Sequence, residues 1–194
     1  MFYQGEPILV DSGRLNYTEE FGVQPEAHNT ITINGFGSIP RKSHRFPKGY
    51  ANCKQTLTHE HRSDTLFLKF TTNGFSRLYP NLFWSREWQL EKNKVLIKDS
   101  LEGSDNKKFD IRLFFHFSAS TLINQNMKLW KGNCRGMPFV FDVPTEFFVQ
   151  RHCGSENSIG WQVHEYGKSI PSPTLELLTN NSLPAIFQSS LRFT

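Results

Sequence analysis

Two side chains near the amino end of the sequence have the chemistry of metal ligands. Asp11 lies in the turn sequence Asp-Ser-Gly, and His28 opens the sequence His-Asn-Thr. A carboxylate oxygen and an imidazole nitrogen both suit Zn²⁺ at roughly 2.0–2.2 Å, but structural zinc needs four ligands and catalytic zinc needs three plus water. An Asp followed two residues later by Gly is also ordinary turn chemistry, and His28 can simply precede a strand. Spacing alone favours the turn, and a metal site requires a further ligand.

Other histidines in the chain have structural interpretations. His59 and His61, in "THEHR", would share one face of a strand and can bind a metal as a pair. The neighbouring Glu60 and Arg62 favour an exposed polar strand edge instead. His116 lies among phenylalanines in "LFFHFS", which favours a buried imidazole that is held by hydrogen bonds.

No complete enzyme motif is visible. The sequence contains no nucleophile elbow, P-loop, dinucleotide-binding fingerprint or HExxH zinc motif. The glycine-rich stretch "NGFGSIP" lacks the lysine and the following helix that a phosphate-binding loop needs, so we expect it to be a plain loop. Catalytic machinery contained wholly within this chain is therefore not predicted.

The pattern of apolar residues predicts an all-β protein. Runs of four to eight residues, such as "PILV", "TLFLKF" and "KVLIKDSL", alternate with clusters of Gly, Pro, Asn and Asp. We expect one antiparallel β-sandwich domain over residues 1–194, supersandwich-like and with little helix. Phenylalanine occurs 18 times and should dominate the core. In "LFWSREWQL", Trp84, Arg86 and Trp88 should face inward, with Arg86 stacked on an indole or paired with a buried acid.

The net charge and the composition limit the classes of partner that this chain could bind. The net charge is +4 and the pI is near 9.0, which favours an anionic partner, but the basic residues are scattered and do not form a nucleic-acid arm. Three cysteines without a CxxC pair indicate three thiols. No apolar stretch is long enough to span a membrane, and the first residues do not resemble a signal peptide. The chain begins as if within a strand, so we expect a fragment of a larger protein.

Four stretches of the chain resemble a known family. They are "DSGRLNY", "AHNTITING", "WSREWQLEKNKVLIKD" and "WQVHEYGKSIPSPTLELL". Together they resemble the C-terminal β-sheet domain of the heparinase II/III-like polysaccharide lyases, and His-Asn-Thr with its following strand is the most specific part. The resemblance implies that this chain is the C-terminal half of a lyase whose N-terminal α/α toroid forms the other wall of the cleft. It further implies β-elimination on an acidic polysaccharide that contains uronic acid, such as a glycosaminoglycan, and a bacterial periplasm or cell envelope for the parent protein.

The resemblance also assigns candidate site residues. It makes Asp11 and His28 two ligands of a zinc ion whose third ligand comes from a His-x-His-x-Asp stretch that this chain lacks. With the basic loop after "NGFGSIP", it suggests a set of substrate-binding residues: Tyr17, Asn29, Arg41, Arg45 and Arg86. One departure from the family pattern is "GVQPEA", which stands where an arginine usually precedes His-Asn-Thr. Because the toroid and the His-x-His-x-Asp stretch are not in this sequence, we expect the domain to be catalytically incomplete by itself.

An alternative from another functional class is a non-catalytic glycan-binding or structural β-sandwich. Aromatic rings that stack on sugar faces and nearby cations would then provide the affinity. The candidate surface comprises Arg41, Lys42, Arg45, Tyr50, Tyr79 and Trp84. Binding of acidic glycans without turnover would distinguish this alternative from the lyase.

Overall fold

The computed structural model describes residues 1–13, 15, 23–39, 53–103, 107–126, 129–154 and 159–194. Five of the candidate residues named above lie outside the described residues: Tyr17, Arg41, Lys42, Arg45 and Tyr50. Within the described ranges, no helix is long and apolar enough to cross a membrane.

The described part of the chain is built almost entirely of strands. They are β1 (Phe2–Tyr3), β2 (Glu6–Pro7), β3 (Ile31–Ile33), β4 (Phe36–Gly37), β5 (Gln55–Arg62), β6 (Thr65–Thr72), β7 (Phe83–Glu91), β8 (Lys94–Glu102), β9 (Lys108–His116), β10 (Thr121–Asn126), β11 (Leu129–Cys134), β12 (Met137–Asp142), β13 (Phe148–His152), β14 (Trp161–Glu165), β15 (Lys168–Pro171), β16 (Thr174–Ser182) and β17 (Ala185–Phe193). The helical segments among these residues are two short 3₁₀ turns, η1 (Pro25–Ala27) and η3 (Gly74–Arg77).

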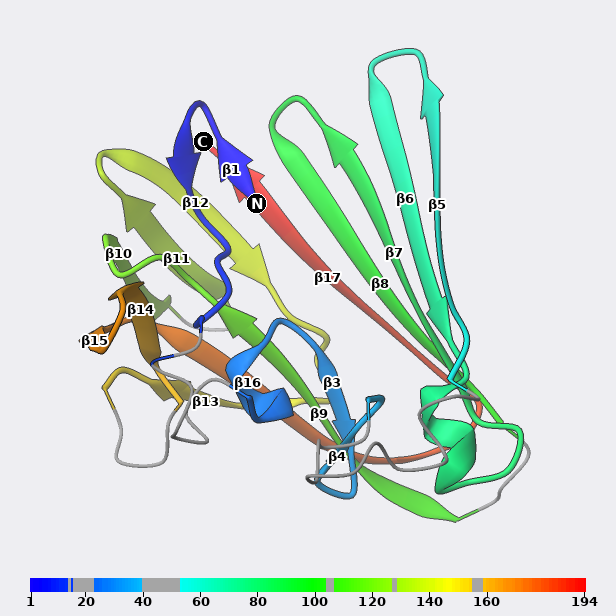
Figure 1. Ribbon diagram of the computed structural model, residues 1–194. Helices are drawn as coiled ribbons and strands as arrows, with labels where there is room; N and C mark the ends of the chain where they lie inside the picture. Colours follow the sequence, from blue (N-terminus) through cyan, green and yellow to red (C-terminus); the bar gives the residue numbers. More distant parts are fainter. Residues whose placement is uncertain (14, 16–22, 40–52, 104–106, 127–128, 155–158) are drawn as a thin grey trace.

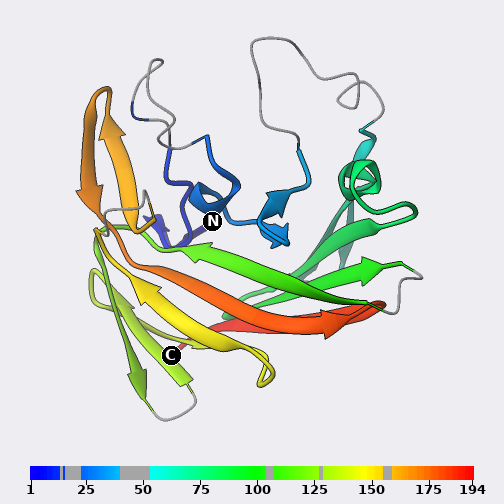
Figure 2. The ribbon, with the colours of Figure 1, turned by 90° about the horizontal axis from the view of Figure 1, so that it is seen from below.

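Two antiparallel sheets pack face to face. An eight-stranded sheet has the order β10-β11-β12-β17-β8-β7-β6-β5, and a five-stranded sheet has the order β13-β16-β9-β3-β4. Figure 1 shows the larger sheet fanning out behind the smaller one, and Figure 2 shows the two layers from below. The predicted antiparallel β-sandwich with little helix is confirmed.

Phenylalanine dominates the core between the sheets, as the composition predicts. Phe115 packs edge-on against Phe141, with ring centroids 4.9 Å apart, and Phe117 packs against Phe139 and Phe141. A single hydrophobic cluster includes residues of both sheets. Burial of so much aromatic area is the main stabilising contribution to the fold.

The backbone near Leu9 and strand β3 both pair with β9 within the plane of the smaller sheet. Ser118 N–H donates to the carbonyl of Ile8 at 3.0 Å, Val10 N–H donates to that of His116 at 2.9 Å, and β3 pairs with β9. Leu113, Phe114, Phe115 and His116 are all buried, so this end of β9 is covered on both faces, which explains why the alternation of "IRLFFHFS" is imperfect.

Two local predictions differ from the structure. The run "PILV" forms only the end of β2 and an isolated antiparallel bridge between Leu9 and Phe117, the residue after β9. The stretch "NGFGSIP" contains the two-residue strand β4, which closes a hairpin over Asn34 and Gly35. That Asn-Gly pair is a standard two-residue hairpin turn, and its signal was present in the sequence.

Candidate metal and substrate site

Asp11 lies in the Asp-Ser-Gly turn, and His28 lies directly after η1. The two residues meet in space. Their side chains contact each other, with 2.7 Å between Oδ2 of Asp11 and Nδ1 of His28. The other carboxylate oxygen of Asp11 accepts a hydrogen bond from Gly13 N–H at 2.9 Å. Gly13 has a φ of +73°, and a Cβ there would lie 3.2 Å from Val163, so this turn requires glycine. The two residues that the sequence singled out are thus direct neighbours.

The electrostatic environment of Asp11 favours its charged form. Partial burial by itself would raise the pKa of this carboxyl, but the hydrogen bonds from His28 and Gly13 outweigh burial and lower the pKa below its usual value. Both side chains keep access to solvent, at 58% exposure for Asp11 and 40% for His28. The pair therefore presents a carboxylate and an imidazole at the protein surface.

His116 holds the two segments that carry this pair. Its Nε2 lies 3.0 Å from the carbonyl of Glu26, and its Nδ1 lies 3.0 Å from the hydroxyl of Ser12 and 2.9 Å from that of Thr174. A carbonyl can only accept, so Nε2 carries the proton and Nδ1 accepts from the hydroxyls. Burial lowers the pKa of His116 to about 4, which keeps this imidazole neutral. The predicted structural role of His116 is confirmed.

Asn29 ties the same segments together through its side chain. Its amide nitrogen donates to the carbonyl of Val10 at 2.6 Å, and its amide oxygen accepts from His116 N–H at 2.8 Å. The side chain of Asn29 thus bonds to backbone groups beside Asp11 and on β9. This arrangement is that of a positioning residue, and the substrate contact suggested for Asn29 stays a prediction.

Arg86 is buried between the sheets, where it meets Asp99. Its exposed fraction is 2%, and it donates to both carboxylate oxygens of Asp99, at 2.8 and 3.0 Å. Its Nη1 also donates to the carbonyl of Asn29 at 2.7 Å. The guanidinium carbon lies 5.4 Å from the ring centre of Trp84. Two expected roles of Arg86, packing against an indole and pairing with a buried acid, are confirmed. The substrate contact suggested for Arg86 stays a prediction, and its burial between the sheets does not favour that contact.

The position of Trp84 corrects part of the alternative glycan-binding surface. Trp84 is 5% exposed, and its indole N–H donates to Asp99 at 2.8 Å, so it cannot stack on a sugar. Its inward face follows from the alternation of β7 with Arg86. Tyr79 packs edge-on against Phe109, and its hydroxyl accepts from Asn34.

Sequence reasoning missed several of the groups that build the site. Asp99, Ser12 and Thr174 lie in stretches that resemble the family, but no role was predicted for them, and each is identified by its contact with Arg86 or His116. For Asp99 a weak signal existed, since a buried arginine requires a partner.

The donor types of Asp11 and His28 fit two zinc ligands, but they do not complete a site. Within the described residues, no group of three or more His, Cys, Asp or Glu side chains could hold a metal ion. His59 and His61 lie on β5, at the edge of the larger sheet, where every residue is exposed. This placement confirms the polar-edge interpretation.

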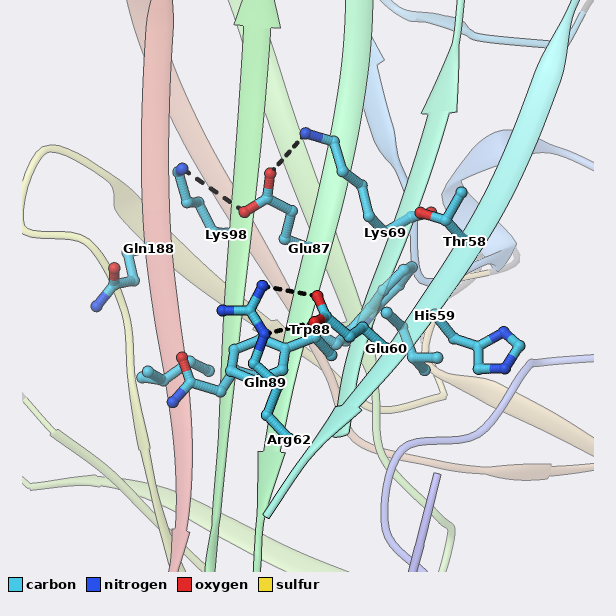
Figure 3. Close-up of a pocket in the computed structure, with 13 residues that line it drawn as sticks. Thr58, His59, Glu60, Arg62, Lys69, Glu87, Trp88, Gln89, Lys98 and Gln188 are labelled. Carbon is cyan, nitrogen blue, oxygen red and sulfur yellow. Dashed lines mark hydrogen bonds and ion pairs between the residues drawn. The ribbon is translucent and has the colours of Figure 1, made fainter. Parts of the chain in front are cut away.

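A hollow of about 500 Å³ lies over β5 to β8. Figure 3 shows Glu87 between Lys69 and Lys98, and Arg62 against Glu60. Glu87 follows the inward-facing Arg86, so this charged row lies on the outer face of the larger sheet. Each of the three cations already contacts a carboxylate, which is typical of a solvated sheet surface.

Several solved structures share the fold of this chain. No curated protein matches the chain by sequence. Among solved structures, the heparan sulfate lyase HepC from Pedobacter heparinus has 15% identity and a TM-score of 0.72, over 97% of this chain and 29% of that chain. The heparinase III product of BT4657 has 13% identity and a TM-score of 0.75, over 100% of this chain and 29% of that chain. A further heparinase III structure has 14% identity and a TM-score of 0.69, over 97% of this chain and 28% of that chain.

These structural similarities establish the fold, and this chain spans less than a third of the length of the proteins it matches. The family follows from the sequence itself. The profile of the family described as "Heparinase II/III-like, C-terminal" matches residues 1–182. The chain therefore belongs to the heparinase II/III-like family, as its C-terminal β-sandwich domain.

Proposed function

We propose that this domain forms one wall of the substrate cleft of a polysaccharide lyase that acts on acidic, uronic-acid-containing glycans. The observation that carries the proposal is the 2.7 Å contact between Asp11 and His28. They are 17 positions apart in the chain, and Asn29 and His116 hold their flanking segments together. A surface pair that is so firmly positioned favours a functional role over a chance contact.

The chemistry of the proposed reaction explains what such a pair contributes. β-Elimination removes the proton at C5 of a uronate and breaks the bond to the 4-oxygen, leaving an unsaturated sugar. The reaction needs the charge of the uronate carboxylate neutralised, a base for the C5 proton and an acid for the leaving oxygen. Asp11 and His28 cannot supply all three groups, so the remainder belongs to an N-terminal domain, which we propose as the partner of this chain.

We propose Asp11 Oδ2 and a nitrogen of His28 as two ligands of a zinc ion whose remaining protein ligand comes from that partner. A bound zinc would supply a fixed positive charge near the substrate. It would also link the two domains through their shared ligands. The residues of this chain would hold and orient that charge. His116 and Asn29 would keep the two ligand side chains in position, and Gly13 N–H would fix the second carboxylate oxygen of Asp11.

The proposal is tested by elimination and binding assays with heparan sulfate, hyaluronan and alginate. The unsaturated product is followed by its ultraviolet absorbance. We expect the 194-residue chain to bind an acidic glycan without elimination, and the longer natural protein that contains it to eliminate. Asp11→Asn and His28→Gln should lower the rate of the longer protein, whereas the exposed-site controls Asp64→Asn and His59→Gln should not.

Two outcomes would contradict the proposal. Full-rate elimination by this chain alone would overturn the incompleteness of its site. Absence of elimination by the longer protein on every acidic glycan would remove the lyase function and leave a glycan-binding or structural module.

A further inference from the structure

We propose that a second pocket, formed by η1, β4 and η3, binds one uronate unit of the glycan, with its carboxylate at Arg77 and its ring on Phe36. The choice of a uronate as occupant rests on the proposed function. The pocket itself does not include Asp11 or His28.

The pocket has apolar walls around a single charged group. Its volume is about 420 Å³. It is lined by Pro25, Gly35, Phe36, Gly37, Ile39, Leu78 and Arg77. Phe36 and Ile39 are each 51% exposed, so apolar surface is accessible at the pocket. An aromatic face beside a cation is the combination that binds an acidic sugar, because the ring stacks on C–H groups and the cation pairs with the carboxylate.

The guanidinium of Arg77 is held in place by backbone carbonyls, and these bonds do not use all of its N–H groups. Its Nη1 donates to the carbonyls of Ser38 and Gly74, and its Nη2 donates to that of Gly37 at 2.7 Å. A guanidinium has five N–H groups, so these bonds leave Nε–H and one N–H of Nη2 for a ligand. Among the described residues, no carboxylate forms an ion pair with Arg77. Within that part of the chain its charge has no acidic partner, unlike the three paired cations of the hollow in Figure 3.

The wall that carries Phe36 is rigid. Asn34 and Gly35 form the hairpin turn between β3 and β4, and Asn34 is fixed by Tyr79 and by the backbone of Asp110. Behind the turn, Gly37 packs against Pro25 so closely that a Cβ would lie 2.8 Å from the proline ring. Phe36 is thus presented from a fixed turn, which lowers the entropic cost of binding.

The pocket is continuous in the chain with the Asp11–His28 pair. Pro25, one of its walls, begins η1, and His28 N–H caps that turn by donating to the carbonyl of Pro25 at 3.1 Å. Strand β3 then runs from just after His28 to the hairpin that carries Phe36. Figures 1 and 2 both place β4 between the two short 3₁₀ turns. The pocket and the pair thus share η1 as a common support.

The test is binding of a glucuronate-containing tetrasaccharide to the 194-residue chain, followed by amide and Arg Nε–H NMR shifts. A carboxyl-reduced tetrasaccharide serves as the matched neutral ligand. We expect shifts at Gly35, Phe36, Gly37 and Arg77 with the acidic ligand, and affinity weaker by about tenfold or more for the reduced ligand, as the loss of a charge-assisted contact implies. Shifts that arise only over Lys69 and Lys98, or equal affinity for both ligands, would overturn the proposal.

Variants provide a second measurement. Arg77→Gln and Phe36→Ala should each weaken binding of the acidic ligand by about tenfold, and Arg77→Gln should abolish the preference over the reduced ligand. Arg135→Gln and Phe148→Ala change an exposed arginine and an exposed phenylalanine elsewhere and should leave binding unchanged. If Arg77→Gln unfolds the chain, Phe36→Ala, at an exposed site, still decides the question. Unchanged binding by Phe36→Ala would contradict the pocket.

Failure of the pocket differs from failure of the proposed function. If the longer protein eliminates normally and these variants leave its KM unchanged, the pocket is wrong and the lyase stands. If the longer protein eliminates no acidic glycan, the lyase is wrong, while the binding experiment on the chain still decides whether the pocket takes a uronate.

Discussion

The side-chain nitrogen of Asn29 donates to the carbonyl of Val10 at 2.6 Å. This single bond links the residue after His28 to the residue before Asp11. Since Asn29 Oδ1 also accepts from His116 N–H, one side chain joins the two ligand segments to β9.

Replacement of Asn29 should therefore loosen the pair. Asn29→Ala removes two hydrogen bonds and leaves a carbonyl and an N–H without their partner. We expect the free energy of unfolding to fall by about 1–3 kcal/mol, measured by urea denaturation. Asn124→Ala, at an exposed position of β10, is the matched control and should change stability little. Equal stability of the two variants would contradict this role of Asn29.

The neutrality of His116 makes the stability of the fold depend on pH. Its pKa is about 4 in the folded protein against 6.5 ordinarily, so between these values the unfolded chain binds more protons. Stability from this group is complete above pH 6.5 and is lost as pH falls toward 4, by on the order of 3 kcal/mol. Denaturation midpoints across this range test the prediction. His116→Asn should flatten the pH dependence, and an unchanged slope in that variant would assign it to other groups.

The buried pair of Arg86 and Asp99 should be sensitive to removal of either partner alone. Arg86→Met leaves Asp99 uncompensated between the sheets, and we expect a loss of about 3–5 kcal/mol. The double variant Arg86→Met/Asp99→Leu should recover part of that loss, because neither charge then remains buried. The surface pair of Lys69 and Glu87 provides the contrast: Lys69→Met should cost less than about 1 kcal/mol. Similar losses from both arginine and lysine variants would refute the distinction.

Zinc binding should reveal how incomplete the ligand set is. Two ligands bind zinc weakly, so we expect low affinity for the 194-residue chain in competition with a chromophoric chelator. Tight binding should require the longer protein and should be lost in Asp11→Asn. Tight zinc binding by the short chain would show that further ligands lie within it.

The carboxyl of Asp11 provides an independent measure of the same contact. His28→Gln removes a hydrogen bond that lowers the pKa of Asp11, so that pKa should rise toward the ordinary value. A carbon NMR titration of the Asp11 carboxyl gives the answer directly. Absence of a rise would mean that Gly13 N–H by itself holds the pKa down.

The sequence alone was sufficient for the fold class and for part of the site. Period-two alternation is a local signal, so it predicted the strands and placed Trp84 and Arg86 on an inward face of β7. The turn at Asp11 and the His-Asn-Thr sequence identified a pair that meets in space.

The tertiary structure decided which groups position that pair and which cations are already paired. Ser12 and His116 are 104 residues apart, and they meet because the backbone before Ser12 pairs with the end of β9. Arg86 finds Asp99 through the register between β7 and β8. Arg77 is left with three carbonyls by the packing of η3 on the segment after β4. Sheet order and register bring such residues together, and local spacing in the chain carries no record of them.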